Sequence, residues 1–227
     1  DVCQQAGNVV DATMRTYREA MKGLLPTPSK SHYTFNLRDF SRVVQGVLLQ
    51  APSGEFANKS SVMRLWTHEA LRVFGDRLTD DNDRKWMCGH AATMCKEIFR
   101  CDFQSEFEHI RPAEETKPGY GTLRRLFWGD YMTPADEDDR PYVEVRDLQL
   151  LQNRTEDSLA EFNQTSKKPM ELVMFMFAIE HVSRIARVLR MPGGNALLVG
   201  VGGSGRQSLS ILATEMAGYA LFRIEIT

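Results

Sequence analysis

The sequence predicts an α/β protein that is mostly helical, and three observations indicate that class. Apolar side chains recur at helical spacing through most of residues 9–190, proline and glycine separate the periodic segments, and residues 195–227 change to short apolar runs around a glycine-rich stretch. The composition, 42% hydrophobic and 26% charged over 227 residues, is that of an ordinary globular chain. Intrinsic disorder and fibrous repeats are therefore excluded.

Charge and hydropathy exclude two classes of partner. Lys and Arg number 28 against 30 Asp and Glu, a formal net charge of −2, which is not the basic footprint expected of a nucleic-acid binder. The longest strongly apolar run, residues 172–179, is well short of the roughly 20 residues that cross a bilayer. We therefore expect no nucleic acid and no membrane as partner. The first residue is Asp1 and no secretory leader follows, so we expect a piece excised from a longer chain.

Cysteine usage predicts a reducing compartment. Four cysteines are few for this length, so a disulfide framework is not expected. Three of them and a histidine, a set that zinc could use, lack the tight pairs of a structural site: Cys88, His90, Cys95 and Cys101. We expect buried thiols here and no metal ligands.

The first half of the chain reads as successive amphipathic helices. The first covers residues 9–25 and stops at Pro26, and the second begins after Asn36, a plausible N-cap. The predicted apolar face of the second helix carries Leu37, Phe40, Val44 and Leu48, flanked by Val43 and Val47. Arg38 and Arg42 share the opposite, polar face.

Two further helices follow before residue 100. The first, over residues 62–74, has Arg64, His68 and Arg72 four apart on its expected polar side. Neighbouring residues on a helix do not face each other, so we interpret His68 and Glu69 as packing or surface groups, not as a catalytic pair. The second begins at a cap within residues 80–83 and continues to residue 98.

Residues 111–141 have neither a helical nor a strand period and are the expected connection between domains. Phe127, Trp128 and Tyr131 lie within this segment, where we expect them to anchor the loop to a core. Helical spacing returns over residues 148–162 and 170–190, and Pro192 with Gly193 ends the second of these helices.

Residues 196–226 have the order of a phosphate-binding unit. An apolar run at 196–199 predicts a strand, residues 200–208 form a glycine loop, residues 209–217 have helical spacing, and residues 221–226 alternate as a second strand. Glycines allow successive backbone N–H groups to point inward, and the next helix presents its positive end to an anion. Four residues supply this geometry: Gly200, Gly202, Gly203 and Gly205.

The loop matches the P-loop pattern G-x-x-x-x-G-K-[ST] only in part. Gly200 and Gly205 fit, but Arg206 replaces the lysine and Gln207 replaces the hydroxyl residue that binds magnesium. Ser208 comes one position too late for that hydroxyl. Phosphate binding tolerates these changes better than catalysis does. The alternative left open is that the glycines, with Ser204 between them, only form a tight turn.

The string from Asn195 to Leu209, NALLVGVGGSGRQSL, resembles the fourth AAA+ module of axonemal dynein heavy chains, whose P-loop has the same Arg-Gln-Ser departure. Residues 33–42 resemble the sensor-2 helix in the small subdomain of the third module, and residues 65–77 resemble the next helix. Residues 172–190 are similar to the helix before the fourth P-loop. The resemblance covers nearly the whole chain.

The resemblance implies a division of the chain and roles for particular residues. Residues 1–30 would end the large subdomain of one AAA+ module, residues 31–139 would form a helical small (lid) subdomain with a linker, and residues 140–227 would begin the next P-loop NTPase large subdomain: strand, P-loop, helix, strand. Arg38 would be the sensor-2 arginine. Tyr142 and Val143 would lie beside adenine, with a plain strand edge as an equally open alternative.

The resemblance also implies a function for the intact protein. Such proteins are ATP-driven, minus-end-directed microtubule motors of cilia and flagella, which place this chain in the cytoplasm, in the cytoskeleton of the axoneme. Implied partners are the rest of the dynein ring, microtubules, and dynein intermediate and light chains, and a coiled coil would lie elsewhere in the full chain. ATP or ADP would occupy residues 200–208, with Mg²⁺ weakly supported. The rival interpretation is a non-catalytic helical interaction domain.

Overall fold

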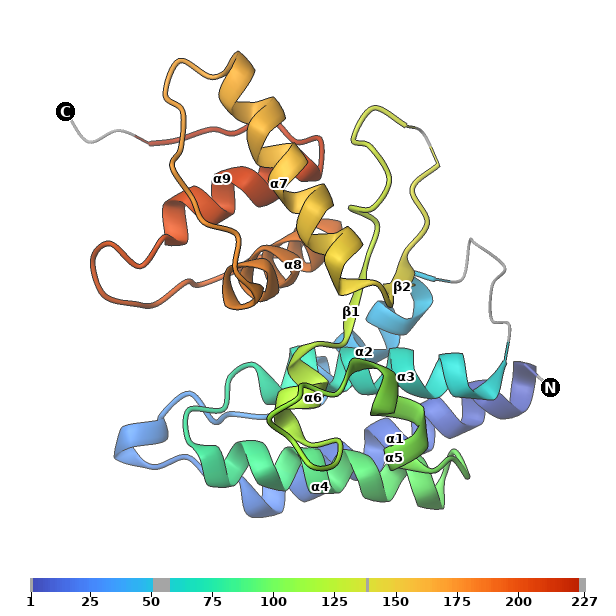
Figure 1. Ribbon diagram of the computed structural model, residues 1–227. Helices are drawn as coiled ribbons and strands as arrows, with labels where there is room; N and C mark the ends of the chain where they lie inside the picture. Colours follow the sequence, from blue (N-terminus) through green and yellow to red (C-terminus); the bar gives the residue numbers. More distant parts are fainter. Residues whose placement is uncertain (1, 51–57, 138, 225–227) are drawn as a thin grey trace. The chain divides into compact units, whose positions relative to one another are not determined.

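The computed structural model describes residues 2–50, 58–137 and 139–224, in two compact units, Asp1–Leu126 and Phe127–Thr227 (Figure 1). Each unit is described by itself. The helices of the first unit are α1 (Val2–Gly23), η1 (Pro28–Lys30), α2 (Leu37–Leu48), α3 (Lys59–Ala70), the π-helical η3 (Leu71–Gly75), α4 (Asp81–Glu97), α5 (Phe103–Phe107), η4 (Glu108–Ile110) and α6 (Tyr120–Arg124). The second unit contains β1 (Phe127–Gly129), β2 (Val143–Val145), α7 (Leu148–Thr165), α8 (Met176–Arg190) and α9 (Arg206–Met216). The prediction of a mostly helical chain is confirmed.

Helix α3 is the central helix of the first unit. Every residue from Val62 to Ala70 is buried, and the helix contacts both α1 and α2. The Trp66 indole donates a hydrogen bond to Thr13 Oγ1 of α1 at 3.0 Å and packs against the Phe99 ring. A helix buried on all sides has no solvent face, so the predicted polar side of Arg64, His68 and Arg72 is wrong.

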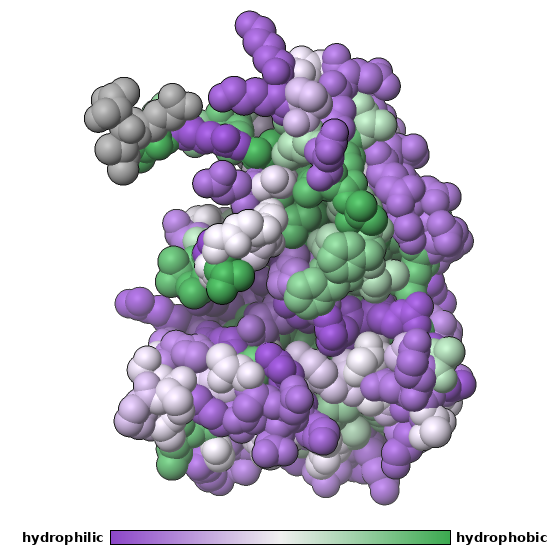
Figure 2. Space-filling model, turned by 60° about the vertical axis from the view of Figure 1, so that its left-hand side comes forward, coloured by the Kyte–Doolittle hydropathy of each residue, from purple (hydrophilic) through white to green (hydrophobic). Residues whose placement is uncertain are grey.

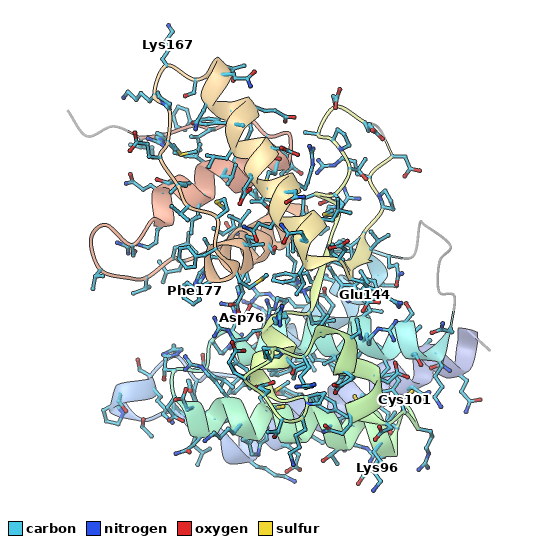
Figure 3. The ribbon with its side chains drawn as sticks, viewed as in Figure 1. Asp76, Lys96, Cys101, Glu144, Lys167 and Phe177 are labelled. Carbon is cyan, nitrogen blue, oxygen red and sulfur yellow. The ribbon has the colours of Figure 1, made fainter. Side chains whose placement is uncertain are left out.

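Those polar residues have charged partners inside the first unit. Arg64 Nη1 lies 2.7 Å from Glu106 Oε2 of α5, and Arg72 Nη2 lies 3.2 Å from Asp76 Oδ1; Asp76 is labelled in Figure 3. His68 Nδ1 lies 3.0 Å from Glu69 Oε1, with both side chains buried. The expectation that these two neighbours do not meet was therefore wrong. Burial is the reason, because solvent does not compete for either side chain.

Helix α2 begins where the sequence predicts, but it buries a different face. The Asn36 side chain accepts from the Arg38 N–H, and the Asp39 carboxylate accepts from the Asn36 N–H at 2.9 Å, which together form a capping box. The buried positions are Asp39, Val43, Gly46 and Val47. Leu37 and Leu48 are more than half exposed, so the predicted apolar face is displaced around the helix by its packing on α1 and α3.

The predicted cap of α4 is confirmed at Asp80, whose side chain accepts from the Asp83 N–H at 2.9 Å. Lys30 of η1 forms ion pairs with both Asp80 and Asp83. The hydrogen bonds from Lys30 and from the Asp83 backbone lower the pKa of Asp80 to about 2. These contacts connect the loop after α1 to the first turn of α4.

The core of the second unit lies between α7, α8, α9 and the β1–β2 pair. The strands pair antiparallel, with Phe127 opposite Val145 and Gly129 opposite Val143. Ile179 and Val182 of α8 are buried together with Leu212 of α9 and Leu151 of α7. Phe127, Trp128 and Tyr131 are buried, as predicted for anchors. Strand β1 was not predicted, because it lies in a segment without a period, whereas β2 includes Val143, for which a strand edge was left open.

The strands predicted at 196–199 and 221–226 are not present in the described residues. Residues 194–201 and 219–224 have no regular structure, and 225–226 lie outside the described part of the chain. The helix between them is present as α9. A strand is stable only when a neighbour satisfies its backbone groups, and here Leu197, Val199, Phe222 and Ile224 are each more than 80% exposed. Figure 2 shows apolar side chains in green on the second unit, to which these segments belong.

No helix in the described ranges is long and apolar enough to span a bilayer.

The absence of pairing in these segments predicts their hydrogen exchange. In the 227-residue chain, the amides of residues 196–203 and 220–224 should exchange close to the rate of an unfolded peptide, because no strand protects them. The amides of α2, α3 and α4 should be protected by their helical hydrogen bonds and by burial. Exchange measured by mass spectrometry on peptides from both regions tests this, and equal protection in the two regions would contradict it.

His90 of α4 predicts a pH dependence of the first unit. Burial lowers the pKa of its imidazole, partly offset by the carboxylates of Glu19 and Glu97, while Nε2 lies 3.0 Å from Thr16 Oγ1. Because the pKa of His90 is lowered in the folded state, the free energy of unfolding has its full value above about pH 6.5. It declines as the pH falls through the pKa of the folded state. Thermal unfolding between pH 8 and 5 should show that decline. The His90→Gln variant keeps a donor toward Thr16 and should have a shallower profile; an identical profile would contradict the assignment.

Candidate functional site

The glycine loop leads directly into a helix. Gly203 and Gly205 both have φ of 76°, in the left-handed region where a side chain would be strained. Gly205 is the N-cap of α9, and the Leu209 N–H donates to its carbonyl at 2.8 Å. The glycines at these two positions therefore allow the turn that starts α9 at Arg206.

The start of α9 has no side-chain cap. In α2, α3 and α4, by contrast, Asn36, Asn58 and Asp80 accept a backbone N–H of the first turn. Gly205 has no side chain that could do so. The first N–H groups of α9, and the positive end of its dipole, are left for an external acceptor such as a phosphate oxygen or water.

Arg206 lies folded over the loop. Its Nη2 donates to the Val201 carbonyl at 3.1 Å and its Nη1 donates to the Leu198 carbonyl at 3.4 Å. A Cβ placed on Gly200 would lie 3.5 Å from Arg206 Cδ and 3.1 Å from Ser204 Oγ. The guanidinium thus connects the two ends of the loop, and contact with phosphate requires it to exchange these carbonyls for the anion.

The side chains near the loop do not fit a magnesium ion. Gln207 is exposed and Ser208 half-buried in the first turn of α9, so the amide occupies the position of the expected hydroxyl and the hydroxyl comes one residue later. Within the described ranges, no group of three or more His, Cys, Asp or Glu residues could hold a metal ion. Oxygen donors for magnesium are therefore poor at this loop.

Arg38, the sensor-2 candidate, lies in the first turn of α2 with its side chain exposed. Its neighbour Asp39 is buried, and its Oδ1 accepts from Arg77 Nη2 at 2.8 Å and lies 3.9 Å from Arg42 Nη1. Asp39 thus provides a negative charge beside the two arginines of α2, Arg38 and Arg42. Among the described residues, Arg38 has no ion-pair partner at its guanidinium, which remains accessible to an anion.

Tyr142 and Val143 lie where β2 begins. Tyr142 is buried, with its ring 6.4 Å from the Trp128 ring, and Val143 pairs with Gly129 of β1. The structure therefore gives Val143 a place in the small sheet and buries Tyr142 directly before it. Their contact with adenine stays a prediction.

Two residues with structural roles at the site were missed from sequence. Arg77 connects the end of η3 to Asp39, and Arg140 donates to the last carbonyls of α9. Arg77 lies in a string that carries the resemblance, residues 65–77, and Arg140 lies two residues before Tyr142, but the partners of both arginines are distant in sequence. Only the fold could identify those partners.

Two protein-family models match the chain, and both describe dynein ATPase regions. "Dynein heavy chain, ATPase lid domain" matches residues 1–84, and "P-loop containing dynein motor region D4" matches residues 170–227. The matched segments are the one that carries α2 with Arg38 and the one that carries the glycine loop with α9. The fold and its loop are therefore of the AAA+ class found in dyneins.

Curated relatives give the narrower family. The chain is 49% identical over 220 residues to dynein axonemal heavy chain 12 of Homo sapiens, 48% over 219 residues to dynein axonemal heavy chain 3 of Homo sapiens, and 40% over 227 residues to dynein axonemal heavy chain 6 of Homo sapiens. The alignments cover 96%, 96% and 100% of this chain but only 7%, 5% and 5% of those proteins. The chain belongs to the axonemal dynein heavy-chain family, and it spans a small part of the length of its relatives.

The two arginines near Asp39 should differ in their effect on folding. Arg77→Ala leaves the buried Asp39 carboxylate without its closest cation and should lower the free energy of unfolding by about 2 kcal/mol. Arg38→Ala removes an exposed side chain and should change the free energy of unfolding by less than about 0.5 kcal/mol. Urea unfolding of both variants tests this. Equal decreases in the free energy of unfolding would contradict the pairing of Asp39 with Arg77.

Proposed function

We propose that this chain contributes an AAA+ lid and a nucleotide-binding P-loop to an ATP-driven, minus-end-directed microtubule motor, an axonemal dynein heavy chain. The observation that carries the proposal is the glycine loop, in which two left-handed glycines lead into the uncapped N-terminus of α9. Backbone N–H groups supply this recognition of phosphate, so it does not depend on the residue types that differ from the P-loop pattern.

ATP or ADP is the proposed ligand of residues 200–208. In this proposal the N–H groups of residues 202–206 hold phosphate oxygens, and Arg206 releases the Leu198 and Val201 carbonyls to join them. An arginine offers a planar fork of donors, which suits bidentate contact with phosphate. Ser204, Gln207 and Ser208 complete the loop around the ligand.

Hydrolysis at this loop is proposed to be weak or absent. Phosphoryl transfer needs a metal ion that bridges the β- and γ-oxygens and neutralises developing charge. Gln207 stands where the hydroxyl that holds this ion belongs, and Ser208 is displaced by one position. The site is therefore proposed to regulate or stabilise the ring by binding nucleotide.

The first unit is proposed as the lid of the preceding module. Its exposed Arg38 would read the γ-phosphate of nucleotide bound there, which agrees with a guanidinium that has no ion-pair partner among the described residues. Residues 1–30 would end the preceding large subdomain, residues 31–139 would form the lid and linker, and residues 140–227 would begin the next large subdomain. Tyr142 and Val143 are proposed beside adenine at the start of that subdomain.

The proposed location is the axoneme of cilia or flagella, and the proposed partners are the rest of the dynein ring, microtubules, and dynein intermediate and light chains. The names of the relatives support the location, since each is called an axonemal heavy chain. The alternative is a non-catalytic helical interaction domain in which the loop is only a turn. One observation favours it, namely the Arg206 guanidinium folded onto the loop carbonyls.

Arg38→Ala, made in a complete heavy chain, should weaken the coupling between nucleotide in the preceding module and closure of its lid. The guanidinium would lose a charge-assisted contact to phosphate worth about 1.5–3 kcal/mol, so nucleotide affinity at that module should fall about tenfold or more. Stopped-flow binding of a fluorescent ATP analogue, with Arg42→Ala as the matched control on the same helix, measures this. A normal ATP response in Arg38→Ala would refute the sensor role.

Substitutions at the glycine loop should separate binding from catalysis. Arg206→Ala should reduce occupancy of the loop by nucleotide, because a phosphate donor is lost. The double change of Arg206→Lys with Gln207→Thr restores the P-loop pattern and should make nucleotide affinity more dependent on magnesium. Equilibrium binding of ADP with and without magnesium tests both changes. An affinity that neither substitution alters would favour the loop as a mere turn.

Single-turnover hydrolysis assigned to this loop in the intact ring is the test of the proposed function. The other nucleotide sites would be silenced by substitution, and bound nucleotide would be analysed after rapid quenching. Bound nucleotide with slow or no conversion of ATP is the expected result. Rapid turnover would refute the proposal of weak or absent hydrolysis. An empty loop at saturating ATP would refute the proposal of a nucleotide site.

A further inference from the structure

The far end of the glycine-loop helix is held by Arg140. The Arg140 Nη2 donates to the Met216 carbonyl at 2.8 Å and Nη1 donates to the Ala217 carbonyl at 3.1 Å, at the C-terminal end of α9. A cation at this end also interacts favourably with the helix dipole. Gly218, with φ of 72°, ends the helix, and a Cβ there would lie 3.2 Å from the Ala135 carbonyl oxygen. The loop between β1 and β2 therefore packs closely on the end of α9.

Arg140 also joins this helix end to two other elements. Its Nη2 lies 3.4 Å from the Asp130 carbonyl and 3.8 Å from Asp130 Oδ1, and both side chains are only 10% exposed. The other carboxylate oxygen of Asp130 lies 3.5 Å from Nε of Arg190, the last residue of α8. Asp130 follows β1 and Arg140 precedes β2, so this cluster, which we call the Arg140 clamp, connects the hairpin, α8 and α9.

Helix α9 is a short rigid link between the clamp and the glycine loop. Its 11 residues span about 16 Å, and the packing of Leu212 and Ala213 in the core allows the helix little freedom to bend. A displacement of its C-terminal end is therefore transmitted to Arg206 and to the loop before it. The clamp also lies two residues from Tyr142, the proposed neighbour of adenine.

We propose that Arg140 is a positioning residue, which fixes the glycine loop by holding the opposite end of α9. Its effect on nucleotide affinity rests on the proposed function; its effect on the loop does not. Lysine cannot replace it fully, because one ammonium lacks the planar fork that reaches two carbonyls and Asp130 together.

Hydrogen exchange of the nucleotide-free 227-residue chain tests the proposal. We compare Arg140→Gln with Arg146→Gln, a matched control whose exposed guanidinium pairs with Glu144 nearby. In Arg140→Gln, peptides over residues 209–213, the half of α9 next to the glycine loop, should exchange at least fivefold faster than in the parent chain, and in the control they should not change. Faster exchange only at residues 214–218 would overturn the proposal, because Arg140 would then merely cap the helix.

Two further measurements distinguish a failure of the Arg140 proposal from a failure of the proposed nucleotide site. If the parent chain binds the fluorescent analogue mant-ADP, Arg140→Gln should weaken its affinity about tenfold, and an unchanged affinity would overturn the positioning role. If the parent chain binds no mant-ADP, the proposed nucleotide site fails, whereas the exchange at residues 209–213 still decides the proposal. Should Arg140→Gln not fold, Arg140→Lys must accelerate exchange at residues 209–213 at least twofold. Unchanged exchange in Arg140→Lys would refute the role of the Arg140 clamp.

Discussion

The packing of α8 against α9 is the interaction on which the second unit depends. Ile179, Val182 and Ala186 of α8 lie in one buried cluster with Leu212 and Met216 of α9. This contact holds the helix that follows the glycine loop, so the loop is presented on a fixed helix although the segments on both sides of α9 have no regular structure. A phosphate site made of backbone N–H groups requires such a fixed helix, since its geometry is set by the backbone alone.

The first unit is organised by a different constraint, which is the burial of α3 on every side. Burial of charged side chains is costly unless each finds a partner, and here Arg64 has Glu106 and Arg72 has Asp76. Asp39 and Arg77 extend the same principle to the start of α2, where Arg38 is left at the surface. The interior charges hold the helices in register, while the exposed arginine is available for a function.

Local features of this chain could be predicted from its sequence, and tertiary ones could not. The caps at Asn36 and Asp80 are made by side chains that accept from backbone N–H groups within three residues, so short patterns predict them. The buried face of α2 was misjudged because it depends on α1 and α3, and the partners of Arg64 and Arg140 are distant along the chain. The strand at 196–199 was predicted from its apolar run, but pairing, which no local pattern supplies, decides whether a strand forms. At the site, the glycine turn was foreseen, whereas the position of Arg206 on the loop carbonyls was not.

The proposed phosphate site, formed by the glycine loop and the start of α9, is made of backbone N–H groups. The most direct measurement is the change of amide chemical shifts when the isotopically labelled 227-residue chain is titrated with ADP, and separately with inorganic pyrophosphate. Saturable shifts are expected at Gly203, Gly205 and Arg206 with both ligands, while the amides of α3 stay unchanged. Shifts absent at residues 202–207 at millimolar ADP, or spread evenly over the chain, would contradict it.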